Sequence, residues 1–367
     1  MQRARVLEII GKRPVGGVGT VILNYQTYMD AQKVQMDYLI FGEEKEPFDE
    51  AIEALGSKVY VYPALSGSQM GKTKAYLEDF FKKHATEYDI VHLHAPNIAF
   101  LTFPIVAKYG IKHRIVHSHA TLYAENKIKA LRNQLLWALA KGKITDRIGC
   151  SKAAGDFLFG KEEFTVLKNA IAYEDYLYNE KLREEVRQRE GVKDKLVVGN
   201  VGRFSQQKNQ TQLVKIFAKI KELCPASTLW LVGDGELRGE IEAKIRELKL
   251  EEDVRLFGMV KNAKELYQAM DVMVMPSLFE GLPMVGVEAQ ASGLPCVYSD
   301  PITREVDVVG CPYLALSESA ETWAKAAMKA ANEKTRRSYA QELDALGFNI
   351  KLEAKRLEEL YLEKVRG

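Results

Sequence analysis

The chain has 367 residues, 47% of them hydrophobic, and is too long for one ordinary core, so two domains of moderate size are expected. Its 52 basic and 50 acidic residues nearly balance, which gives no global charge argument for a nucleic-acid partner. The apolar run at residues 6–10 is too short for a signal peptide, and no run reaches the roughly eighteen residues of a transmembrane helix. We therefore expect a cytoplasmic protein. Its four scattered cysteines are expected to be free thiols rather than disulfides or zinc ligands.

Strand-like and helix-like runs alternate along the chain, which is the pattern of doubly wound parallel sheets in an α/β protein. The first series of predicted strands is at residues 6–10, 36–41, 59–62, 89–94, 113–117, 147–150 and 164–167. A charged, helix-like stretch at residues 174–190 follows. The second series is at residues 196–201, 228–232, 254–257, 271–275, 295–298 and 312–316. Two Rossmann-like domains facing a central cleft are therefore expected, one at residues 1–175 and one at 176–349.

A glycine-containing segment, residues 11–20, follows the first predicted strand and leads into a helix. It lacks the Gly-Lys-Ser/Thr ending of a P-loop, and Ile22 stands where a dinucleotide fingerprint requires a third glycine. Neither ATP nor NAD is supported, which argues against an NAD oxidoreductase. Gly16 and Gly17 would instead let the backbone approach a ligand, with a flexible turn as the alternative interpretation.

Four of the six histidines lie at the ends of two predicted strands, as His92, His94, His117 and His119. Alternation places each pair on one face of its strand. A zinc site is the alternative interpretation of this pattern, but no cysteine or carboxylate lies close in sequence to complete it. We predict no metal, and we expect at least one histidine of each pair to be a core residue.

An amphipathic helix is predicted at residues 123–143, basic on one side and apolar on the other. A core helix with a solvated basic face is the simpler interpretation. Weak peripheral binding to anionic lipid is the alternative, because such lipid attracts basic amphipathic surfaces.

Cationic and glycine-containing turns follow the first three strands of the second domain. Arg203 and Lys208 lie in the loop after the first strand, where a guanidinium fork and an ammonium could clamp a diphosphate at a helix N-terminus. Gly233 follows the second strand, where a glycine turn could simply relieve backbone crowding. Met259 and Val260 follow the third, and their amides could pair with a nucleobase edge.

Two carboxylates eight positions apart, Glu280 and Glu288, lie across a predicted strand-loop-helix unit at residues 271–291. Pro276, Gly281 and Pro283 mark the loop, so Glu280 falls in the loop and Glu288 in the helix. The carboxyl edge of a parallel sheet is where open α/β folds bind ligands, and helix N-termini there favour anions.

The run from Pro276 to Ala289 resembles the signature of glycosyltransferase family 4, whose members are retaining enzymes of the GT-B architecture. Three other segments resemble the same family: Gly-Arg-Phe at 202–204 with Lys208-Asn209, Gly-Asp-Gly at 233–235, and His-Ser-His-Ala at 117–120. The resemblance implies that the final helix, residues 350–367, packs back on the first domain.

The resemblance also implies transfer of a sugar from a nucleotide diphosphate sugar, with UDP the expected nucleotide, to a glycan or polyprenyl-linked acceptor in capsule or exopolysaccharide synthesis. No cofactor or metal is expected, because Arg203 and Lys208 would stabilise the leaving diphosphate. The implied roles of the other residues concern the ribose, the donor sugar and the donor phosphate. These residues are Glu288 for the ribose; Glu280, His119 and the amides of Gly281, Leu282, Pro283 and Met284 for the sugar; and the Gly16-Gly17 loop for phosphate and acceptor. The resemblance also places the Gly233 turn near the nucleotide.

Two other functions stay open at this point. A nucleotide-sugar epimerase of GT-B build would convert the donor without an acceptor. A catalytically silent glycan-binding subunit would keep the fold without turnover.

Overall fold

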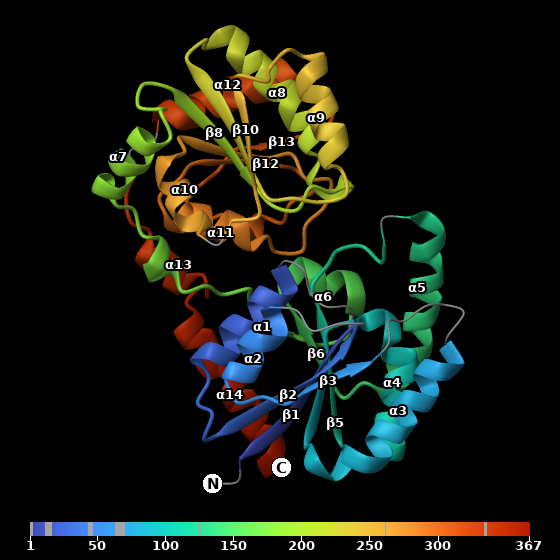
Figure 1. The fold of residues 1–367 in the computed structure, drawn as a ribbon. Coiled ribbons are helices and arrows are strands. Elements are labelled where there is room, and N and C mark those ends of the chain that lie inside the picture. Colours follow the sequence, from blue (N-terminus) through green and yellow to red (C-terminus); the bar gives the residue numbers. More distant parts are fainter. Residues whose placement is uncertain are drawn as a thin grey trace. The chain divides into compact units, whose positions relative to one another are not determined.

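The structure is a computed structural model that describes residues 3–11, 17–42, 47–62, 70–124, 126–260, 262–333 and 336–367 (Figure 1). The chain divides into two compact units, Met1–Ala170 with Asn349–Gly367, termed unit 1, and Ile171–Phe348, termed unit 2. Each unit is built on its own parallel sheet, so the predicted doubly wound α/β class is confirmed.

The sheet of unit 1 has the strand order β3-β2-β1-β4-β5-β6-β7. Its strands are β1 (Ala4–Ile10), β2 (Val34–Phe41), β3 (Val59–Tyr62), β4 (Ile90–Leu93), β5 (His113–Ser118), β6 (Asp146–Gly149) and β7 (Thr165–Val166). All pair in parallel. The order changes direction between β1 and β4, so the loops at their carboxyl ends diverge there and leave room for a ligand.

Helices cover both faces of this sheet, as parallel strands require. They are α1 (Gly17–Tyr28), α2 (Pro47–Ala54), α3 (Met70–His84), α4 (Ala99–Lys108), α5 (Lys127–Ala140), α6 (Lys152–Phe159) and α14 (Ile350–Arg366), with 3-10 turns η2 (Ala85–Glu87), η3 (Pro96–Ile98) and η4 (Lys141–Lys143). The helices α3, α4 and α5 lie on one side of the sheet, and α1, α2 and α14 on the other (Figure 1).

The C-terminal helix α14 belongs to unit 1 although unit 2 separates it from the rest. Asn349 caps its first turn by accepting the Lys351 amide at 3.0 Å. Its buried face includes Leu357 and Tyr361 and packs against α1, β1 and β2. Tyr361, which is 353 positions from Glu8 in the sequence, thereby reaches the core of the unit 1 sheet.

The sheet of unit 2 has the order β10-β9-β8-β11-β12-β13, again all parallel. Its strands are β8 (Leu196–Val201), β9 (Ser227–Val232), β10 (Val254–Gly258), β11 (Val272–Met275), β12 (Cys296–Ser299) and β13 (Tyr313–Leu314). The direction of the order changes between β8 and β11. The Arg203 and Glu280 loops leave the sheet at this switch point.

The helices of unit 2 also form two layers, with α8, α9 and α12 on one face and α7, α10 and α11 on the other (Figure 1). The helices are α7 (Glu180–Arg189), α8 (Gln210–Leu223), α9 (Arg238–Glu247), α10 (Ala263–Ala269), α11 (Met284–Ala291), α12 (Ala320–Glu333) and α13 (Ala340–Ala345), with 3-10 turns η5 (Tyr173–Tyr176), η6 (Gln206–Lys208) and η7 (Arg304–Val306). The helix-like stretch predicted at 174–190 is helical in two separate parts. Asn179 caps the Leu182 amide, so the segment divides into η5 and a helix that starts at Glu180.

All four cysteines are free thiols, as predicted, and three of them are buried. Among the described residues no helix combines the length and the apolar character needed to cross a bilayer.

Candidate active site

Two loops are joined at the switch point of unit 2. The Leu278 amide donates to the Gln207 carbonyl at 2.8 Å, and the Asn209 side chain donates to the Pro276 carbonyl at 3.1 Å. Asn209 adopts φ 55°, a left-handed conformation that asparagine tolerates better than most residues, and it ends the turn before α8. These bonds hold Lys208 and Glu280 on adjacent loops.

Lys208 and Glu280 form a largely buried ion pair, with Nζ and Oε1 2.6 Å apart and side chains 16% and 6% exposed. Gln207 donates to the second carboxylate oxygen at 3.0 Å. A buried ion pair contributes little net stability, because desolvation offsets the attraction. The arrangement therefore favours a role in binding, in which the ammonium can exchange its carboxylate partner for a phosphate oxygen.

Arg203 lies on the same loop but contacts a different carboxylate. Its guanidinium pairs with Glu236 at 3.0 Å, and its side chain is 59% exposed. The structure therefore does not show the predicted convergence of Arg203 and Lys208 on one point. An exposed pair of this kind is worth at most about 1 kcal/mol, so a ligand phosphate can readily replace Glu236.

The turn after β9 packs tightly against the loop after β8. A Cβ atom on Gly233 would lie 2.1 Å from the Gly202 carbonyl oxygen, and one on Gly235 would lie 2.4 Å from the Phe204 carbonyl oxygen. Only glycine permits this approach. The Gly233 amide also donates to the Gly258 carbonyl at 2.9 Å, which ties the turn to the end of β10. Relief of backbone crowding therefore explains why both positions are glycine. That the Gly233 turn lies near a nucleotide stays a prediction.

Met259 and Val260 follow β10 directly. Met259 is 74% exposed and Val260 is partly exposed. An exposed methionine at the carboxyl edge of a sheet can pack on a planar ligand. The base-binding role of these two residues stays a prediction.

Glu288 lies in α11, whose bounds match the predicted helix. It accepts a hydrogen bond from the Tyr267 hydroxyl at 2.8 Å. Burial raises the pKa of the Glu288 carboxyl, and hydrogen bonds from Tyr267 and Tyr176 oppose that rise. The carboxyl keeps acceptor capacity beyond these bonds, which is what a ribose hydroxyl would use.

The predicted amide row at residues 281–284 needs one correction. Pro283 has no amide hydrogen, so it cannot donate to a sugar. Its carbonyl instead accepts the Gly286 amide at 3.0 Å and starts α11. The amides of Gly281, Leu282 and Met284 remain the candidate donors.

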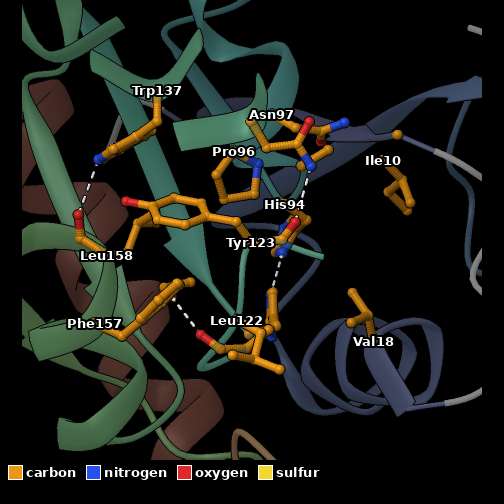
Figure 2. A pocket seen from close by; sticks show the side chains of 16 residues that line it. Ile10, Val18, His94, Pro96, Asn97, Leu122, Tyr123, Trp137, Phe157 and Leu158 are labelled. Atoms are coloured by element: carbon orange, nitrogen blue, oxygen red, sulfur yellow. Dashed lines mark hydrogen bonds between the residues drawn. The ribbon is translucent and has the colours of Figure 1, made fainter. Parts of the chain in front are cut away.

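Unit 1 has a cavity of about 500 Å³ at its own switch point (Figure 2). His94 and His119 are among its polar lining residues, and the aromatic rings of Tyr123, Trp137 and Phe157 are among the others. The Trp137 indole donates to the Leu158 carbonyl at 2.9 Å, which fixes that wall. Rings of this kind suit the C–H faces of a sugar.

The glycine segment of unit 1 differs from the prediction. Helix α1 begins at Gly17, so Gly17 is helical rather than part of a loop. Gly16 lies outside the described residues.

The four histidines form one cluster, with ring centroids 4.4 Å apart for His92 and His94 and 4.0 Å apart for His117 and His119. This confirms that each pair shares a face. The sequence analysis did not identify Glu8, whose carboxylate oxygen Oε2 is hydrogen-bonded to His94 Nε2 at 2.7 Å. A lone acidic residue inside the apolar run of β1 was the available signal.

One ring nitrogen from each of His92, His94 and His117 lies within 4.8 Å of the others, which is a spacing that could hold a metal ion. Both ring nitrogens of His94, however, are already hydrogen-bonded, to Glu8 at 2.7 Å and to His119 at 2.8 Å. A metal would have to displace one of these bonds.

Two Rossmann-like units, each with its own parallel sheet, are the architecture of the GT-B fold. Residues 15–158 match the family described as Glycosyltransferase Family 4, and residues 182–342 match Glycosyl transferases group 1. The EpsF protein of Bacillus subtilis (strain 168), a proposed glycosyltransferase, is 35% identical over 94% of this chain and 93% of its own. The chain therefore belongs to the family 4 glycosyltransferases, as its motifs predicted.

Other relatives agree with this assignment. The Escherichia coli UDP-Gal:alpha-D-GlcNAc-diphosphoundecaprenol alpha-1,3-galactosyltransferase is 27% identical over 72% of each chain. Anabaena Alr3699/HepE in complex with UDP has a TM-score of 0.79, with 21% identity over 98% of this chain and 99% of that one. The sucrose-phosphate synthase of Thermosynechococcus elongatus has a TM-score of 0.78 at 18% identity over 99% and 100%. Because these relatives include transferases, neither the epimerase nor the silent subunit is favoured.

Proposed function

We propose that the protein transfers a sugar from a UDP-linked donor to a glycan or polyprenyl-linked acceptor in capsule or exopolysaccharide synthesis, with retention of the anomeric configuration. The observation that carries the proposal is the buried Lys208–Glu280 pair at the switch point of unit 2, where α/β folds bind ligands. The E. coli relative, whose name includes a UDP-galactose donor and a diphosphoundecaprenol acceptor, supports this choice of substrates.

The donor would be held by residues of several unit 2 loops. Lys208 and Arg203 would leave their carboxylate partners and contact the diphosphate, and Glu288 would accept from ribose hydroxyls. The Met259 and Val260 amides would contact the base. Glu280 and the amides of Gly281, Leu282 and Met284 would hold the transferred sugar, and His119 of unit 1 would contact the same sugar.

In the proposed reaction the bond between the anomeric carbon and the phosphate oxygen breaks, and the acceptor oxygen bonds to the same face of the sugar. The acceptor hydroxyl proton passes to the departing phosphate oxygen, so no dedicated protein base is needed. Lys208 and Arg203 would stabilise the charge that develops on the diphosphate, in place of a divalent cation. We therefore expect full activity in the presence of EDTA.

A membrane surface is the proposed location of the reaction, through α5 on the cytoplasmic side. Four apolar side chains of α5 are exposed, in a row that we term the α5 stripe: Ile128 81%, Leu131 60%, Leu135 62% and Leu139 71%. Their spacing places them on one face of the helix, whereas Asn133, Trp137 and Ala140 face the core. The helix packs on the core through Trp137 and Ala140, as the core-helix interpretation expects, and the exposed face carries an apolar row in addition to basic residues.

Basic residues flank the stripe, among them Lys127, Lys129 and Arg132, and suit anionic lipid. Co-sedimentation with vesicles should show binding to anionic lipid and little binding to neutral lipid. The double change Leu131→Glu with Leu135→Glu should abolish it, whereas Leu352→Glu, at a 56% exposed leucine of α14, should not. Equal sedimentation with both lipids would end the membrane proposal.

The decisive experiment begins with a thermal-shift screen of the purified protein against UDP, GDP, ADP and dTDP. Selective stabilisation by UDP is expected, since a ligand that binds the folded state raises its stability. Incubation with the matching UDP-sugars, with and without a polyprenyl diphosphate glycan, then follows. NMR of the product should show transfer with the donor's anomeric configuration. Conversion of the donor without acceptor, or an inverted product, would contradict the proposal.

A further inference from the structure

The cavity of unit 1 has an uncharged wall. None of the described residues that line it is an acid, a lysine or an arginine. A phosphate or carboxylate placed there would lose its water without meeting a cation, which is costly. The rings of Tyr123, Trp137 and Phe157 favour a neutral group with C–H faces. The cavity therefore suits a neutral sugar and not the phosphates of a lipid-linked acceptor.

One residue of this wall is bonded to a cation outside the cavity. Asn133 of α5 lines the cavity and is 8% exposed, and its amide donates to the Tyr123 carbonyl at 2.9 Å. Its Oδ1 accepts from Arg132 twice, from Nε at 3.2 Å and from Nη2 at 2.9 Å. A guanidinium has further N–H groups beyond these two, so Arg132 is held beside the cavity while it can still donate to a ligand.

Lys129 extends the positive charge towards the start of α5. It lies three positions before Arg132, so the two side chains are neighbours on the helix surface. Both residues are exposed, and within the described parts of the chain neither has an ion-pair partner. Lys129 also lies in the first turn of the helix, where the helix dipole favours anions. Two adjacent cations of this kind suit a diphosphate, in which each phosphate carries a negative charge.

The order of these groups around α5 follows from its period of 3.6 residues. Asn133 faces the core, whereas Leu131 and Leu135 belong to the α5 stripe. Arg132 and Lys129 lie between these two faces, on the side of Asn133. The helix therefore presents a neutral cavity, two cations and an apolar stripe in succession. A sugar that is joined through a diphosphate to a lipid has the same three kinds of group in the same order.

We propose that Lys129 and Arg132 bind the diphosphate of a lipid-linked acceptor, with its sugar in the unit 1 cavity and its polyprenyl chain directed along the α5 stripe into the lipid layer. This inference rests on the proposed function and chooses between its two acceptor classes, because it requires a lipid diphosphate and not a free glycan. It also gives these two cations a ligand beyond the anionic headgroups that the basic residues of α5 attract together.

Binding can be measured by calorimetry on the full-length protein, with UDP in excess to occupy unit 2. Farnesyl diphosphate is the test ligand, and farnesol and inorganic diphosphate each lack one of its two parts. We expect farnesyl diphosphate to bind most tightly. The double change Lys129→Gln with Arg132→Gln should raise its Kd about tenfold, because charge-assisted hydrogen bonds are lost.

The control is Lys141→Gln with Lys143→Gln, which removes the same charge from the exposed η4 turn at the end of α5. Its Kd for farnesyl diphosphate should equal that of the unmodified protein. Equal Kd values in the two double variants, or equally tight binding of farnesol, would overturn the proposal.

Transfer assays give a second readout that separates this inference from the proposed function. The Lys129 and Arg132 double variant should have an acceptor KM about tenfold higher for a sugar diphosphate lipid, with an unchanged KM for the donor. No transfer by the unmodified protein to any acceptor would refute the proposed function, while the binding results would still stand. Transfer with an unchanged acceptor KM would refute this inference alone. Lost sedimentation with anionic vesicles, together with an unchanged Kd for farnesyl diphosphate, would assign both cations to lipid headgroups and overturn it as well.

Discussion

The two units share a topology but differ in the chemistry at their switch points. In unit 2 an ammonium and a carboxylate, Lys208 and Glu280, are 2.6 Å apart in a largely buried setting. In unit 1 the corresponding position has a histidine, His94, hydrogen-bonded to the buried Glu8 carboxylate, beside a cavity partly lined by aromatic rings. A cation suits a charged ligand and an uncharged, aromatic-lined cavity suits a neutral one, so the same topology carries two chemically different surfaces.

The largest effect should come from Lys208→Ala. Loss of the ammonium should remove on the order of 2–4 kcal/mol of transition-state stabilisation, or about 30- to 900-fold in kcat. It should also lower the free energy of unfolding by about 3 kcal/mol, because Glu280 stays buried without its cation. Steady-state kinetics and urea denaturation measure the two effects. Lys215→Ala, on the exposed side of α8, is the control.

A double change separates the two effects of Lys208→Ala. Adding Glu280→Gln removes the uncompensated charge, so stability should return towards that of the unmodified protein while turnover stays low. Recovery of turnover in the double variant would contradict a catalytic role for Lys208.

Arg203→Ala should lower activity without lowering stability. Its partner Glu236 is 52% exposed, so the pair contributes at most about 1 kcal/mol to folding. We expect a loss of about 2 kcal/mol in transition-state stabilisation, near 30-fold in kcat/KM. Arg337→Ala, at an equally exposed arginine paired with a partly exposed carboxylate, is the matched control. Normal turnover by the Arg203 variant would leave Lys208 as the sole cation of the site.

Acid should destabilise unit 1 through its histidines. Burial lowers the pKa of His94 and His117, so the unfolded chain binds protons that the folded chain does not. Stability is therefore complete above the unfolded pKa near 6.5 and falls as the pH drops below it. Each group contributes at most about 1.4 kcal/mol per pH unit. Melting curves between pH 7.5 and 5 should show the decline, and His117→Phe should reduce its slope. An equal slope in the two proteins would show that His117 titrates normally.

Much of the fold of both units could be predicted from the sequence, because parallel strands that are buried on both faces appear in it as continuous apolar runs. Every predicted strand is present, and α11 begins and ends where Pro283 and Gly293 indicate. The hydrogen bonds that join Glu8 to His94 and to Tyr361 could not be predicted in this way. Glu8 lies 86 positions from His94 and 353 from Tyr361, and a local pattern carries no information on contacts at such separations. The outward direction of the α5 stripe was equally hidden, since periodicity shows that a helix has two faces but not which one packs.

The smallest of these effects should come from Glu288→Gln, which tests whether unit 2 also recognises the neutral part of the donor. The amide keeps the size of the side chain but weakens acceptance from ribose hydroxyls, so the Kd for UDP measured by calorimetry should rise about tenfold, or near 1.4 kcal/mol. The existing bond from Tyr267 at 2.8 Å should survive, because the amide oxygen also accepts, and the melting temperature should change little. Glu305→Gln, on the η7 turn, serves as the control. If UDP bound both variants equally well, Glu288 would be a structural partner of Tyr267, and recognition in unit 2 would rest on its cations alone.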